Sequence, residues 1–118
     1  MKNFRDLNVW SKSHKVALKV YGLTKSFPKE EIYSLTSQMR RSASSIPTNI
    51  AEGCGRGSDS QFGYFLNVAL GSASELEYQI ILSSDLKLIS DENSKEILEE
   101  LIEVKKMLTK LYKAVSRK

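Results

Sequence analysis

The segment from residue 35 to residue 57 constrains the fold most, because its apolar residues recur at intervals of three or four. This spacing is typical of one face of an α-helix. The residues on that face are Leu35, Met39, Ala43, Ile46 and Ile50. Ser34 is a suitable N-cap for the helix. Pro47 lies inside the pattern without a backbone N–H, so we expect the helix to kink or open locally there. Gly53 predicts its C-terminal stop.

Three further segments have helical spacing. One face of the first segment consists of Leu7, Trp10, His14, Ala17, Leu18 and Tyr21. Its helix ends at the latest before Phe27 and Pro28. Ser58 and Gln61 form a capping box that predicts the start of a third helix, which runs to about Leu88. The fourth segment has a heptad-like seam made of Ile97, Leu101, Val104, Leu108, Leu111 and Val115.

Four helical segments with short connections predict an all-α fold, an antiparallel up-down-up-down four-helix bundle. No alternating strand pattern and no repeat of about twenty to fifty residues is apparent. The chain has 118 residues, of which 41% are hydrophobic, and it lacks a linker rich in proline and serine. We therefore expect residues 1–118 to form a single domain.

Apolar residues on a second helical face predict that the chain self-associates. One face of the third segment carries Phe62, Phe65, Leu66, Ala69, Ala73, Leu76 and Ile80. Other faces carry Tyr64, Val68, Leu70, Tyr78, Ile81 and Leu82. A helix that is apolar nearly all round is buried on all sides. Val9, Val16 and Val20 add a second stripe to the first segment, and we expect both surfaces to meet another subunit. The alternative is a wide core-facing stripe with a few exposed leucines.

Positive charge gathers in two places, although the net charge is only +4, from 18 Lys and Arg against 14 Asp and Glu. A face of the first segment, opposite the stripe of Trp10, carries Arg5, Lys12, Lys15 and Lys19. The acid-free end of the chain carries Lys105, Lys106, Lys110, Lys113, Arg117 and Lys118. Such stripes can neutralise phosphates and favour binding of RNA or DNA. The alternative is a solvated face, because lysines near a helix C-terminus also complement the helix dipole.

The arginines near the proline-containing helix are a separate group of candidates. Arg40 and Arg41 can each make two parallel bonds to a phosphate or a carboxylate. They either contact nucleic acid or pair with Glu52, Glu75 or Glu77, within one subunit or between two. Arg56 lies between glycines and is better placed to reach an external anion. This glycine-rich run lacks the lysine and Ser/Thr of a P-loop, which argues against nucleotide binding.

The chain offers little for catalysis, metal binding or membrane insertion. Its one histidine and one cysteine do not make a set of nucleophile, base and orienting group. His14 lies on the expected core stripe and is interpreted as an interior histidine, whereas Cys54 is a candidate exposed thiol. A lone cysteine suits a reducing cytoplasm. Bundle metal sites use Glu-x-x-His pairs, and none is present. We expect no enzyme activity, no cofactor, no metal and no membrane span.

Several stretches resemble the bacterial family encoded by 23S rRNA intervening sequences. They are LNVW at residues 7–10, VYGLTKSFP at 20–28, LTSQMRRSA at 35–43, SIPTNIAEG at 45–53 and ALGSASELE at 69–77. The resemblance covers nearly the whole chain. Its most specific parts are the spacing from the paired arginines through Ser-Ile-Pro to Asn-Ile-Ala-Glu-Gly, and the run that ends in Glu-Leu-Glu.

This resemblance implies an antiparallel four-helix bundle that assembles as a homopentamer, without known catalytic activity and with a role in binding nucleic acid. One branch of similar proteins serves as an accessory factor to the reverse transcriptase of diversity-generating retroelements, which adds RNA to the possible ligands. Two functions therefore remain open. The first is a nucleic-acid-binding accessory factor, and the second is a structural module that contacts a protein partner and has no nucleic-acid role.

Overall fold

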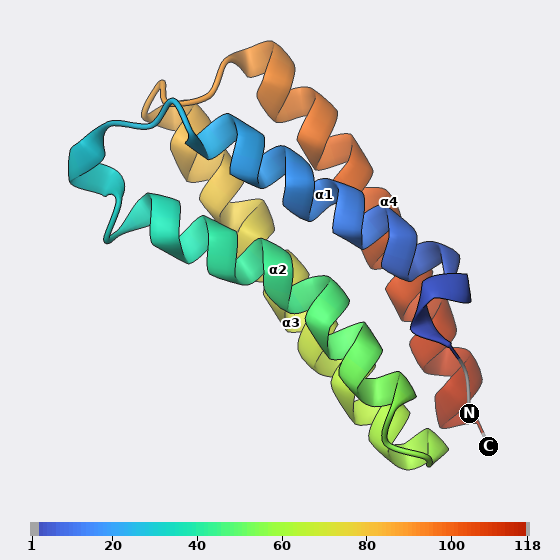
Figure 1. Cartoon of the computed structure of the whole chain (residues 1–118). Coiled ribbons are helices and arrows are strands. Elements are labelled where there is room, and N and C mark those ends of the chain that lie inside the picture. The colour runs from blue at the N-terminus through green and yellow to red at the C-terminus, as the bar shows by residue number, and fades with distance from the viewer. Residues whose placement is uncertain (1–2, 118) are drawn as a thin grey trace.

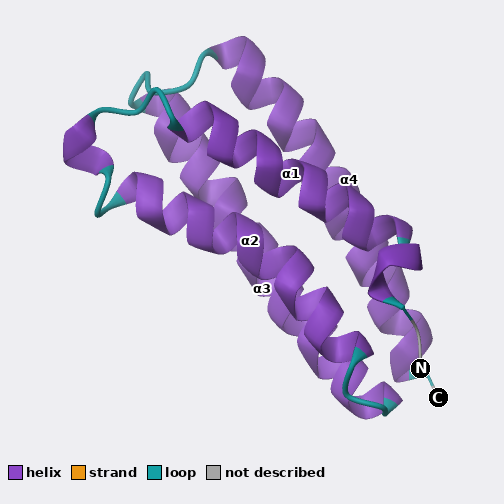
Figure 2. Ribbon diagram, in the orientation of Figure 1, coloured by secondary structure: helices purple, strands orange, loops and turns teal. Residues whose placement is uncertain are grey.

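Four long helices make up most of the computed structural model, which describes residues 3–117. The long helices are α1 (Asn8–Thr24), α2 (Leu35–Cys54), α3 (Asp59–Asp85) and α4 (Asp91–Ser116). The short 3-10 helix η1 (Phe4–Asp6) precedes α1, and a second, η2 (Lys29–Glu31), lies between α1 and α2. The described residues contain no strand (Figure 2). The predicted all-α class is confirmed.

The helices form an elongated bundle with extents of 45 × 24 × 20 Å. Each long helix contacts two others, because α1 and α3 both lie against α2 and α4. Successive helices run in opposite directions, and the start of α1 lies at the same end of the bundle as the end of α4 (Figure 1). The arrangement is the antiparallel up-down-up-down bundle expected from short connections.

Serine caps define where two of the helices begin. The hydroxyl of Ser58 accepts a hydrogen bond of 3.2 Å from the backbone N–H of Gln61, as the capping box predicts. Ser90 accepts in the same way from Asn93, at 3.1 Å, and so starts α4. Ser34 precedes α2, but its hydroxyl donates to Glu31 instead of capping the helix. Ser58 and Ser90 therefore cap their helices with the side chain, and Ser34 does not.

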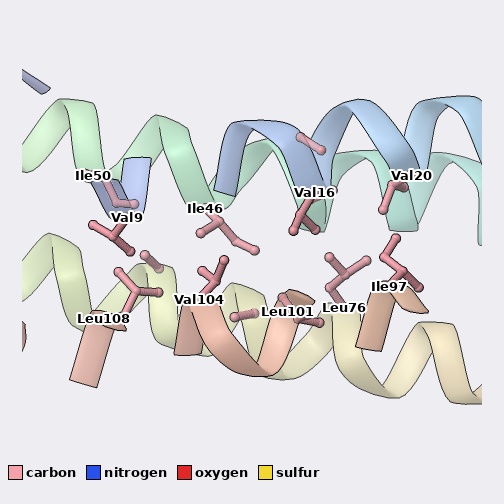
Figure 3. Close-up of a cluster of buried hydrophobic side chains, with 14 of the residues drawn as sticks. Val9, Val16, Val20, Ile46, Ile50, Leu76, Ile97, Leu101, Val104 and Leu108 are labelled. Carbon is pink, nitrogen blue, oxygen red and sulfur yellow. The ribbon is translucent and has the colours of Figure 1, made fainter. Parts of the chain in front are cut away.

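The core lies along the axis shared by all four helices. Every apolar residue predicted on the face of α2 is buried, and the seam of α4 is buried except for the half-buried Leu111. Figure 3 shows valines, leucines and isoleucines from the four helices pointing toward one another. Regular apolar spacing therefore identified the inner faces of α2 and α4 correctly.

The prediction for α1 was wrong in the orientation of the helix, since only Ala17 of the six residues on the expected face is buried. Val9, Val16 and Val20 lie in the core, at most 4% exposed, whereas Leu18 is 58% and Tyr21 42% exposed. The valine stripe is thus no subunit contact. His14 is exposed and not interior, for the same reason.

The inner face of α1 includes two buried hydroxyls. Ser13 and Thr24 continue the valine stripe and are buried. Each donates to a carbonyl of its own helix, Ser13 to Trp10 at 2.9 Å and Thr24 to Val20 at 2.7 Å. A hydroxyl satisfied within the helix can be buried without a partner from elsewhere. The face therefore looks less apolar in sequence than it behaves in the fold.

The C-terminal part of α2 differs from the prediction at Gly53 and Cys54. The helix continues through the buried Pro47 and through Gly53, so Gly53 is not its stop. A Cβ atom at Gly53 would lie 2.9 Å from Cδ1 of Phe62 and 3.0 Å from Cβ of Phe65. The glycine therefore permits close approach of α2 and α3. Cys54 follows it and is buried, which overturns the prediction of an exposed thiol.

Candidate nucleic-acid interface

The lysines of α1 face the acidic first half of α4. Lys19 Nζ lies 3.0 Å from the Glu96 carboxylate and forms a second ion pair with Glu100. These hydrogen bonds, that to Glu100 first and that to Glu96 second, raise the pKa of Lys19 above its ordinary value of 10.5. The positive charge of Lys19 is thus already balanced by carboxylates of the same protomer, although both glutamates remain accessible to water.

Lys12 and Lys15 share a surface depression of about 340 Å³ with carboxylates of α4. The acids that line it are Glu99, Glu100 and Glu103. A phosphate approaching these two lysines would meet at least as many negative groups as positive ones. Contact between α1 and α4 therefore reduces the positive potential that the sequence of α1 alone suggests.

Arg40 lies against the C-terminal end of α1. Its Nε donates to the hydroxyl of Thr24 at 2.9 Å, and its Nη2 donates to the Tyr21 carbonyl at 3.4 Å. The guanidinium carbon also lies 4.8 Å from the centre of the Tyr21 ring. A cation at this position complements the negative end of the α1 dipole. Arg40 thus holds two helices together and pairs with none of the three glutamates considered for it.

The other three candidate arginines have different surroundings. Arg5 belongs to η1 rather than to the helix with the lysines, and lies 5.2 Å from the centre of the Phe4 ring. Arg56 follows α2, where it pairs with Glu52 at 3.0 Å and lies over Phe65. Arg41 is exposed on α2 and has no ion pair within residues 3–117. The candidate residues are Arg5, Lys12, Lys15, Lys19, Arg40, Arg41 and Arg56. Of these, Lys19 and Arg56 are held in ion pairs, and Arg40 is hydrogen-bonded to α1.

Four lysines of the basic C-terminal stripe line a groove on the second half of α4. It measures about 630 Å³, and its lining includes Lys105, Lys106, Lys110, Lys113, Ile102, Thr109 and Glu77. Lys105 pairs with Glu77 of α3 at 2.8 Å, and no other acid lines the groove. The signal was present in the sequence as a run without acids. These lysines become the strongest candidates for phosphate contacts once the lysines of α1 are found opposite carboxylates.

A second groove, about 700 Å³ in volume, lies between α1 and α2. Its α1 side includes Trp10, His14, Leu18 and Tyr21, and its α2 side includes Ser44, Pro47, Thr48 and Ala51. The rings of Trp10 and His14 are stacked, with centres 5.1 Å apart and planes inclined by 8°. Aromatic side chains are enriched at protein–protein contact surfaces.

Nothing in the described residues is arranged for metal chemistry. No group of three or more His, Cys, Asp and Glu side chains among residues 3–117 is placed to hold a metal ion. The single histidine is stacked on a tryptophan, and the single cysteine is buried. None of the helices in this part of the chain is long and apolar enough to cross a bilayer.

Comparison with known proteins places this geometry in a family. A protein of unknown function from the S23 ribosomal protein family of Bacteroides thetaiotaomicron has a crystal structure with a TM-score of 0.82 to this one. The two are 31% identical, and the match covers 89% of this chain and 95% of the other. No curated protein matches the chain. Residues 5–110 match the 23S rRNA-intervening sequence proteins, and the chain therefore belongs to that family.

Proposed function

We propose that this protein is a non-catalytic, oligomeric accessory factor that binds RNA through phosphate contacts. The observation that carries the proposal is the groove on α4, where four lysines line the surface and Glu77 is the only acid. Lysines at this spacing can follow a phosphate backbone without reading its sequence. The family name, which refers to 23S rRNA, is consistent with a nucleic-acid role. Assembly as a homopentamer is part of the proposal.

The α4 groove and the α1 stripe make competing predictions for where RNA binds. Replacing Lys106, Lys110 and Lys113 with glutamine removes three exposed charges of the groove and spares the ion pair of Lys105. Replacing Lys12 and Lys15 removes two charges that lie opposite carboxylates. If the groove binds RNA, the triple variant should lose affinity and the double variant should resemble the wild type. Affinity for single-stranded RNA, duplex RNA and duplex DNA is measured from low to high salt.

The salt dependence shows whether phosphates are contacted. Each lost contact should reduce the slope of log K against log salt by about 0.7 for a single strand and about 0.9 for a duplex. The mass in solution, determined in the same buffers, should be unchanged in both variants. A loss confined to the Lys12 and Lys15 variant would instead favour the α1 stripe. Absence of binding at low salt would contradict the RNA-binding proposal.

The second candidate function is a protein-interaction module, and the groove between α1 and α2 favours it. Aromatic rings such as those of Trp10 and Tyr21 are enriched at protein interfaces. If RNA does not bind, variants of this groove should alter protein association while the lysine variants have no effect.

A further inference from the structure

The outward side of α3 is an apolar surface that no other helix of the protomer covers. Tyr64 is 64%, Tyr78 61% and Ile81 43% exposed. Gly71 lies between them, and a Cβ atom there would meet nothing within 4 Å. This face also contains one charged residue near its centre, Glu75, which is exposed. A contiguous surface of this kind usually marks a contact with another protein.

The groove between α1 and α2 lies on a different side of the bundle. α3 contacts α2 and α4 but not α1, so α1 and α3 occupy opposite corners. The aromatic side chains of α1 and the small side chains of α2 leave a hollow in which a helix can lie closely. One copy of the chain thus presents both a projecting apolar helix and a groove.

The two surfaces match in height along the bundle. The hydroxyls of Ser45 in α2 and Ser72 in α3 are 2.8 Å apart, which fixes a common level. Arg41 lies four residues from Ser45, and Glu75 lies three residues from Ser72 in the same direction. At about 1.5 Å per residue, the two lie within roughly 2 Å of the same level.

The groove extends from that level toward the other end of the bundle. In that direction, Thr48 of α2 lies three residues from Ser45, and Val68 of α3 lies four residues from Ser72. Gly55 and Tyr64 lie similarly lower, by ten and eight residues. Two copies that differ by rotation about an axis parallel to the bundle, without translation, therefore bring the α3 face from Tyr64 to Glu75 alongside the groove. Tyr78 and Ile81 continue this face beyond the level of Arg41.

The two surfaces also carry opposite charges at the same level of the bundle. Within residues 3–117, neither Arg41 nor Glu75 has an ion pair. The neighbouring candidates are already engaged, since Glu52 pairs with Arg56 and Glu77 with Lys105. A guanidinium at one end of the groove and a carboxylate at the same level of the α3 face can satisfy each other.

We propose that the outward face of α3 docks into the α1–α2 groove of a second copy, with Glu75 of one copy paired to Arg41 of the next. The contact joins two different surfaces, so it repeats from copy to copy and closes into a ring when the rotation permits. The inference rests on the self-association in the proposed function and identifies the surfaces that produce it. It does not depend on RNA binding.

The test is a charge exchange followed by mass in solution. Arg41→Glu and Glu75→Arg each place like charges at the contact, and both should lower the oligomer mass at micromolar concentration toward that of a single chain. Combining the two restores an opposite pair and should restore the wild-type mass. Lys110→Glu, which reverses an exposed charge on α4, should leave the mass unchanged.

A second variant tests the steric fit of the two surfaces. Gly71→Arg projects a long side chain from the middle of the α3 face and should dissociate the oligomer. Gly22→Arg is the matched control, because Gly22 is also an exposed helical glycine with open space at its Cβ position. It should leave the mass unchanged, and all variants should keep the helical circular dichroism of the wild type.

The outcomes separate the two proposals. A wild-type chain that is monomeric at all concentrations overturns both the oligomer and this contact. A wild-type oligomer that keeps its mass in Gly71→Arg and in both charge variants retains self-association but overturns the contact. Dissociation by each charge variant without recovery in the exchanged pair overturns the pairing of Glu75 with Arg41.

Discussion

Gly22 and Gly53 are both helical glycines, and their surroundings give them opposite roles. A methyl group at position 22 enters open space, whereas at position 53 it meets Phe62 and Phe65 at distances that real Cβ atoms do not adopt. Gly22→Ala should raise the free energy of unfolding by about 0.5–1 kcal/mol, because alanine favours the helix. Gly53→Ala should lower it by about 1–3 kcal/mol, because α2 and α3 must move apart. Urea unfolding of the two variants checks both signs, and stabilisation by Gly53→Ala would contradict the close contact.

Lys19 illustrates an ion pair with a limited energetic role. Lys19→Gln should cost less than about 1 kcal/mol, because lysine and glutamates remain accessible to water. The raised pKa means that the stabilisation is complete below pH 10.5 and is lost as the pH rises through the folded-state value. Unfolding of Lys19→Gln and wild type should therefore differ at pH 7 and converge at strongly alkaline pH. Lys106→Gln, which removes a lysine outside the ion pairs described, is the control. An equal difference at both pH values would exclude the pair as the cause.

At the scale of the element, the orientation of α1 determines which surfaces the protein presents. Val16→Ala removes methyl groups from the core and should cost about 1–3 kcal/mol, since Val16 is 1% exposed. Leu18→Ala removes a larger side chain but should cost the isolated protomer less than about 1 kcal/mol, because Leu18 faces solvent. Urea unfolding in dilute solution compares the two, and a greater loss for Leu18→Ala would show the helix rotated as its sequence suggests.

Sequence was sufficient for α2, α3 and α4 and insufficient for α1, for a physical reason. The inner faces of α2 and α4 carry apolar residues at regular spacing, and their outer faces expose only one large hydrophobic side chain, Ile102, so one apolar pattern dominates on each helix. The inner face of α1 includes Ser13 and Thr24, whose hydroxyls are satisfied by their own helix. The aromatic stripe with Trp10 was therefore the stronger apolar signal, although it is the outer one. The spacing of apolar residues within one helix does not show whether they face the core or line a surface groove.

The candidate site was predictable only in part, because charge depends on which helices are neighbours. The basic stripe of α1 is visible in sequence, and so are the acids of α4. Only the contact between α1 and α4 shows that Lys19 is paired and that Lys12 and Lys15 face carboxylates. The pairing of Arg40 with the end of α1 likewise depends on residues far from it in sequence. The α4 lysines gained importance by elimination of these other cations.

For the whole molecule, assembly and RNA binding should be linked through multivalency. An oligomer that contacts one RNA with several copies binds more tightly than a single copy. Glu75→Arg makes the chain more positive, so charge alone should strengthen RNA binding. We expect instead that it weakens binding at least about tenfold by dissociating the oligomer, and that adding Arg41→Glu restores it. Affinity and mass measured at one protein concentration decide this, and tighter binding by Glu75→Arg would separate the two properties.

The division of charge along α4 gives such an assembly two unlike ends. Its acids lie in the first half of the helix, and four of its five lysines lie in the second half. Copies related by rotation about an axis parallel to the bundle all point in the same direction, so the lysine halves form a belt around one rim. A long polyanion would then bind along that rim, so only one of the two ends of the assembly would contact it.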